Sequence, residues 1–190
     1  MTDRSDEIAR RASNNRFRRE RAALVDALRA LVGPRVALEP LADADRAAAL
    51  AAEALAAYRS AEAQEWTIVH SEWRSDALVA MVEFCHAVSA ALGARAVWLI
   101  LPGREPQVVP VSSELVLDNP LGFAALGDYE FMLLDQALPA GLALLRHSHH
   151  WGPEQTTYSW EAEAWGAEPW LSVTTRALRE QQGDSSWGAD

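Results

Sequence analysis

Three of the five histidines of the chain fall within four positions, in the segment 144-LLRHSHHWG-152. If this segment is a β-strand, side chains two positions apart share a face, so His147 and His149 point to the same side of a sheet. Two imidazoles at this spacing can bind one metal ion, and a zinc or iron site would need at least one further His or carboxylate ligand. The sequence therefore suggests a zinc or iron site, with the solvated end of a strand as the alternative.

Carboxylates that could complete this site, or do general acid–base work, lie near the histidines in sequence or could reach them across a sheet. The candidates for a third ligand are Glu130, Asp135, Glu154, Glu161 and Glu163, and those for acid–base work are Asp128, Glu130, Asp135, Glu161 and Glu163. In a strand over 155–164, Glu161 and Glu163 share one face. A solvated sheet face in a chain with 27 acidic residues has the same pattern, so a purely structural role is the alternative.

Several tryptophans and glutamates crowd into the segment that follows the histidines. Tryptophan is enriched at binding hot spots, where its ring is anchored within a polar rim. We therefore predict a partner-binding surface in this region, with an interior role as the alternative, in which the rings seal the sheet against the C-terminal helix. The predicted contact residues are Trp151, Glu154, Trp160, Glu161, Glu163 and Trp165.

The single cysteine, Cys85, lies on the apolar stripe of a helix predicted over 75–92, so we expect it in the core. Its neighbour His86 diverges by about 100° around that helix, so the two cannot form a nucleophile–base pair. No glycine-rich phosphate loop and no zinc-protease or serine-hydrolase signature occurs in the chain. These observations disfavour nucleotide-dependent and cysteine enzymes.

The net charge of −10 is unevenly distributed, because arginines outnumber acidic residues over 1–32 and the rest of the chain is strongly acidic. An acidic body repels phosphates, so nucleic acid is a disfavoured partner and a basic protein a favoured one. We expect the arginine-rich helix to dock on an acidic body, either its own or that of a second copy in a homo-oligomer. All basic residues are arginine, which fits a GC-rich bacterial genome. The N-terminal sequence does not read as a secretory signal, and no apolar run in the sequence is long enough to span a membrane, so we expect a cytoplasmic protein.

Periodicity and breaker residues predict an α+β fold, in which two N-terminal helices precede a mostly antiparallel sheet with one packed helix before it and one after it. Gly33-Pro34 ends the first helix, and Pro110 should confine its strand to a sheet edge. The predicted helices are 5–32, 43–63, 75–92 and 169–181, and the predicted strands are 96–101, 107–111, 129–134, 142–149 and 155–164. The chain would then divide into a helical segment over 1–64, an α+β domain over 65–181 and a flexible tail over 182–190.

The segments 97-VWLIL-101, 128-DYEFMLLD-135 and 142-LALLRHSHHWG-152 have a rhythm of strands and turns that resembles small bacterial immunity proteins. That resemblance implies a non-enzymatic protein that inhibits another protein, as an immunity protein or antitoxin does. Together with the acidic body, it favours a cytosolic binding protein for a basic partner. The alternative is a small metal-dependent enzyme, in which His147 and His149 hold the ion.

Overall fold

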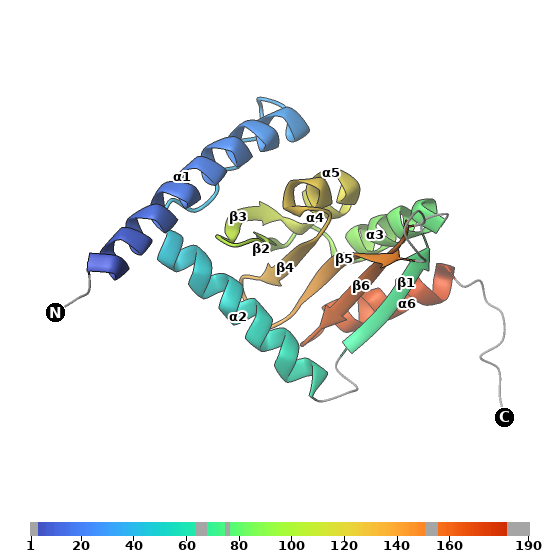
Figure 1. Ribbon diagram of the computed structural model, residues 1–190. Coiled ribbons are helices and arrows are strands. Elements are labelled where there is room, and N and C mark those ends of the chain that lie inside the picture. Colours follow the sequence, from blue (N-terminus) through green and yellow to red (C-terminus); the bar gives the residue numbers. More distant parts are fainter. Residues whose placement is uncertain (1–3, 64–67, 75–76, 151–155, 182–190) are drawn as a thin grey trace.

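The computed structural model describes residues 4–63, 68–74, 77–150 and 156–181, and it confirms the α+β fold. A single antiparallel sheet of six strands has helices on both of its faces (Figure 1). The helices are α1 (Arg4–Val32), α2 (Ala44–Glu62), α3 (Leu78–Leu92), α4 (Ser113–Leu117), α5 (Pro120–Ala124), η3 (Ala125–Gly127) and α6 (Trp170–Gln181). The strands are β1 (Ile68–Arg74), β2 (Ala96–Leu101), β3 (Gln107–Ser112), β4 (Phe131–Asp135), β5 (Gly141–His150) and β6 (Thr156–Trp165).

The strand order is β1-β6-β5-β4-β2-β3, so β1 and β3 form the two edges of the sheet. Pro110 lies in β3, as predicted for a residue that cannot donate a hydrogen bond to a second neighbouring strand. The connection between α1 and α2 passes this edge, where the backbone N–H of Leu41 donates to the carbonyl of Val108 at 2.8 Å. The strand β1 is new relative to the sequence prediction, which assigned no element to its residues.

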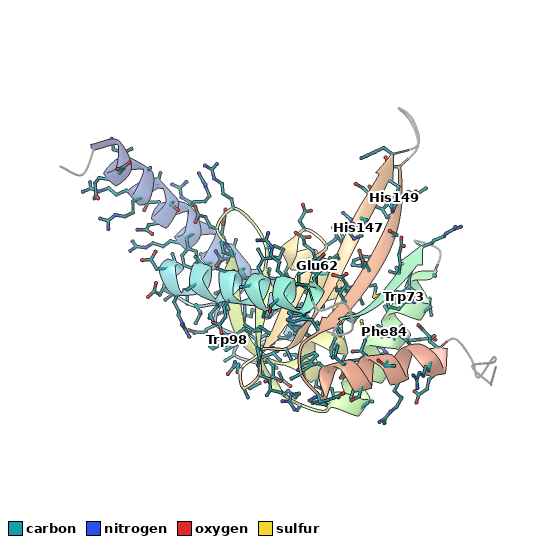
Figure 2. The ribbon with its side chains drawn as sticks, turned by 90° about the horizontal axis from the view of Figure 1, so that it is seen from below. Glu62, Trp73, Phe84, Trp98, His147 and His149 are labelled. Atoms are coloured by element: carbon teal, nitrogen blue, oxygen red, sulfur yellow. The ribbon has the colours of Figure 1, made fainter. Side chains whose placement is uncertain are left out.

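The larger core lies between the sheet and α3, α4, α5 and α6. The apolar stripe of α3 supplies Met81, Phe84, Cys85 and Val88, all at most 1% exposed. Phe84 packs against Trp73 of β1, with ring centroids 4.9 Å apart (Figure 2). Helix α3 ends at Gly93, whose φ of 70° suits a residue without a side chain, as the sequence predicted.

A second, smaller core lies on the opposite face, beneath α2. The side chain of Asp43 accepts hydrogen bonds from the backbone N–H groups of Asp45 and Arg46 and so caps the start of this helix. The fully buried Ala47 and Ala54 allow the helix to approach the sheet closely. Large apolar side chains from α1, α2 and the sheet fill the remaining space, and these are Phe17, Leu50, Ile100, Val108 and Leu134.

Helix α1 contributes to both cores and docks on its own body. Phe17 belongs to the smaller core, whereas Leu24 and Leu28 belong to the larger one. The hydroxyl of Ser13 donates to Glu105 at 2.5 Å, and Arg16 lies 3.6 Å from the same carboxylate. The predicted intramolecular docking of the arginine-rich helix therefore has a structural basis, and self-association through the N-terminal helices stays a prediction.

Within the described parts of the chain, no helix combines the length and the apolar character that crossing a bilayer requires. The longest, α1, carries charged residues along most of its length.

Candidate functional site

Helix α2 covers the start of β5 and the end of β6, whereas the end of β5 and the start of β6 extend beyond this helix. Ala143 of β5 and Trp165 of β6 are buried beneath Ala61 of α2, with Leu145 packed at the edge of this cluster. Since α2 ends at Glu62, the following residues of β5 on the same face are exposed, and these include His147 and His149. Figure 2 shows Glu62 at the end of α2 that is nearer to these two histidines.

Strand alternation and pairing bring several carboxylates to this open face. In the β5–β6 register, Glu161 lies opposite Leu145 and Glu163 lies opposite Ala143, so both lie on the sheet face of which α2 covers one part. Glu72 of β1 lies opposite Glu161 and is exposed. We use the name acidic face for the set formed by Glu62, Glu72, Glu130, Glu161 and Glu163 around His147.

The groups of the acidic face influence one another electrostatically. Burial, then a hydrogen bond to Glu163 and the charges of Glu163, Glu62 and Glu161, raise the pKa of Tyr58 far above its usual range. Burial and the charge of Asp128 raise the pKa of Glu130, and nearby His147 opposes this shift. The carboxylates of Glu62, Glu161 and Glu163 therefore lie close enough to Tyr58 to oppose its ionisation.

The two histidines of the His-x-His motif lie on one face, as predicted, but they have different partners. The Nε2 atom of His147 hydrogen-bonds Glu161, with side chains 46% and 18% exposed. The Nε2 atom of His149 is 2.8 Å from the hydroxyl of Ser159. Asp135 lies elsewhere, tied to Arg95 and Trp170. Over the described ranges, no group of three or more His, Cys, Asp or Glu side chains is arranged to hold a metal ion.

The predicted partner-binding residues divide into three groups. Glu161 and Glu163 lie on the acidic face, as described above. Trp160 and Trp165 are 5% and 0% exposed, so their rings belong to the interior and do not form part of an exposed contact surface. Trp165 packs edge-on against Tyr58 of α2, with centroids 5.6 Å apart. Trp151 and Glu154 lie outside the described residues, as does the predicted tail over 182–190.

The opposite face of the same hairpin carries a cluster that the sequence analysis missed. The guanidinium of Arg146 lies 3.5 Å from the ring centroid of Tyr129 and 4.7 Å from that of Tyr158. Both tyrosines are 40% exposed. Strand alternation places Arg146 and Tyr158 on the face of Trp160, so the sequence pattern could have predicted that these two side chains are neighbours. The approach of Tyr129, in contrast, depends on the turn before β4. In that turn Asp128 and Tyr129 both have positive φ angles.

Cys85 is fully buried, which confirms the predicted core position, and burial raises the pKa of its thiol to about 12. At pH 8 the thiol is therefore neutral in the folded protein and shielded from reagents. We expect iodoacetamide to modify native Cys85 at least on the order of 100-fold more slowly than the urea-unfolded chain. Mass spectrometry of timed samples measures both rates, and equal rates would contradict the structural role.

Comparison of the chain with protein-family models, with curated proteins and with solved structures finds no match in any of the three.

Proposed function

We propose that this chain is a non-enzymatic binding protein whose acidic face holds a basic protein partner. The observation that carries the proposal is the gathering of five carboxylates from α2, β1, β6 and the residue before β4 on one sheet face, at and beyond the end of α2. Like charges gathered in this way do not favour folding, and they gain a favourable interaction when a cationic surface approaches. After burial, the charges of Glu163, Glu62 and Glu161 contribute to the raised pKa of Tyr58, and their proximity supports the same proposal.

The form of binding that we favour is inhibition, as performed by an immunity protein or an antitoxin in the bacterial cytoplasm. Enzymes that cleave nucleic acids carry basic active sites, because they bind phosphates. The acidic face at the end of the β5–β6 hairpin is suited to cover such a site. Complementary charge also speeds the encounter between the two proteins, an advantage for an inhibitor that must act quickly.

Charge removal from the acidic face tests this proposal. We expect the Glu161→Gln/Glu163→Gln variant, used as bait in extracts of the native cell, to bind its basic partner about 10- to 100-fold more weakly than wild type. The matched control is Glu53→Gln/Glu114→Gln, which removes two exposed carboxylates from α2 and α4. Wild type and control should recover the same basic protein. In 0.5 M salt both should recover less of it, because the distance over which exposed charges interact falls to roughly 3–8 Å.

Two results would contradict the proposed function. One is that the wild-type protein recovers no basic partner from the native cell. The other is that the Glu161→Gln/Glu163→Gln variant recovers the partner as well as wild type does. Thermal unfolding of each bait, followed by circular dichroism, verifies that the variants are folded under the conditions of the assay.

A metal-dependent enzyme is the second candidate, because His147, His149 and Glu161 share one face, although no three such side chains of the described residues are arranged to hold an ion. In that alternative the two imidazoles would hold a zinc or iron ion, and a carboxylate would complete the site. Elemental analysis of the purified protein and of a His147→Ala/His149→Ala variant distinguishes it from the binding protein. About one metal ion per chain, lost in the double variant, would favour the enzyme.

A further inference from the structure

A cleft of about 450 Å³ lies on a different part of the molecule, between the middle of α1 and the loop of the β2–β3 hairpin. The residues of η3 and the turn after it form its third side. Figure 1 shows α1 beside β3 on this side of the molecule, away from the β5–β6 hairpin. The volume falls within the range of about 300–1,000 Å³ that is typical of sites for small organic ligands.

The wall of this cleft contains a buried polar side chain with an unsatisfied acceptor. Gln107 is 7% exposed, and its Nε2 group donates to the carbonyl of Glu105 at 3.4 Å. Its Oε1 atom is buried and has no hydrogen-bond partner among the described residues. Buried side-chain acceptors in native proteins are nearly always satisfied. Gln107 lines the cleft, and rotation of its side chain would bring the Oε1 atom, which is shielded from solvent here, to an N–H donor of a bound molecule.

The remaining lining shows what kind of molecule would carry that donor. Leu24, Leu101 and Leu126 give the cleft an apolar wall. The exposed carboxylates of Glu20 and Asp128 stand at its rim. Glu105 adds a third carboxylate, which is already engaged by Ser13 and Arg16. Against these, the lining contains one basic residue, Arg104, which is exposed.

We propose that this cleft binds a small organic cation with an apolar body, such as an amidinium, a guanidinium or a primary amine. The apolar body lies against the leucines, one N–H group donates to the Oε1 atom of Gln107, and the positive charge faces Glu20 and Asp128. This site is separate from the acidic face, so it holds whether or not the proposed function is correct.

Three probes of nearly the same shape test the proposal on the full chain. Benzamidine, benzamide and benzoate share an aromatic ring and a planar head group, and they differ in charge, being cationic, neutral and anionic. In ¹H–¹⁵N correlation spectra we expect benzamidine to bind with a dissociation constant on the order of 1 mM, as is usual for so small a ligand. Benzoate should bind at least about tenfold more weakly, with benzamide between the two.

Variants of the cleft complete the test. We expect Ala23→Phe, which fills the cleft from α1, to abolish benzamidine binding, and the adjacent Ala22→Phe, which is exposed outside the cleft, to leave it unchanged. Gln107→Met, which removes the acceptor at similar side-chain length, should weaken benzamidine binding by about tenfold. The proposal is overturned if benzoate binds as well as benzamidine, or if Ala23→Phe and Ala22→Phe behave alike. The comparison of the two phenylalanine variants decides the question even if Gln107→Met does not fold.

Discussion

Replacement of Gly141 by alanine is expected to lower the free energy of unfolding by about 3 kcal/mol or more. Gly141 begins β5 and pairs with Leu134 on one side and Trp165 on the other. A Cβ atom at this position would lie 1.9 Å from the carbonyl oxygen of Leu133 and 3.0 Å from the indole of Trp165. Because both neighbours are buried strand residues, neither can move aside without disturbing the sheet.

Urea unfolding followed by tryptophan fluorescence measures this effect. Gly103→Ala is the matched control, since a Cβ atom there meets no other atom within 4 Å. We expect the control to change the free energy of unfolding by less than about 0.5 kcal/mol. A loss below about 1 kcal/mol for Gly141→Ala would mean that β4, β5 and β6 are not packed as described.

Replacement of Asp135 by asparagine is expected to cost about 2–4 kcal/mol of stability at pH 7. The Oδ2 atom of Asp135 accepts hydrogen bonds from Nε of Arg95 at 2.6 Å and from the indole N–H of Trp170 at 2.9 Å. Its Oδ1 atom accepts from the backbone N–H of Ala137 at 2.8 Å. An asparagine amide would present either too few acceptors or an N–H group facing other donors, so a buried polar group would lose its partner.

The pH dependence of stability gives a second measurement of the same network. Burial by itself raises the pKa of Asp135, but the hydrogen bonds from Arg95, Trp170 and Ala137 outweigh it and hold the pKa below its usual value. A lowered pKa stabilises the fold above the pKa of the unfolded chain, which is about 3.9, and this stabilisation is lost as the pH falls through the lower native value. The wild-type protein should lose this contribution in acid, and Asp135→Asn should show a correspondingly flatter profile.

An exposed pair of the same chemical type provides the control for this prediction. Asp26 and Arg29 lie 3.7 Å apart on the surface of α1, with side chains 80% and 64% exposed. Asp26→Asn is expected to change stability by less than about 0.5 kcal/mol, because water and salt screen such pairs. Equal effects of the two substitutions would show that Asp135 is not part of a buried network.

The elements themselves could be predicted from the sequence because their signals are local. Gly93 correctly predicted the end of a helix, and Pro110 correctly predicted a strand at the sheet edge. Strand alternation correctly placed His147 and His149 on one face. The strand β1 was missed because charged and polar residues interrupt its short sequence 68-IVHSEWR-74. Its assignment depends on pairing with β6, which no local pattern reveals.

The candidate site could be predicted only in part, because it depends on register and on where a distant helix ends. Alternation grouped Glu161 with Glu163, but only the β5–β6 register brings Glu161 to His147. Likewise, Trp160 and Trp165 are buried by neighbouring elements rather than by their own strand. The cleft on α1 has no sequence signature, because three separate segments form it and Gln107 is unremarkable within an apolar strand.

The pairing of β1 with β6 has a consequence for how the protein forms as it is synthesised. Of the described strands, β1 leaves the ribosome first, yet its hydrogen-bonding neighbour β6 leaves it last. Strands β2 to β5 can pair while synthesis continues, but β1 must wait until β6 has emerged. Such a long-range closure slows folding, because a large loop must be ordered before the contact is made. The nascent chain therefore carries β1 without its neighbouring strand until β2 to β5 and the segments between them have been synthesised.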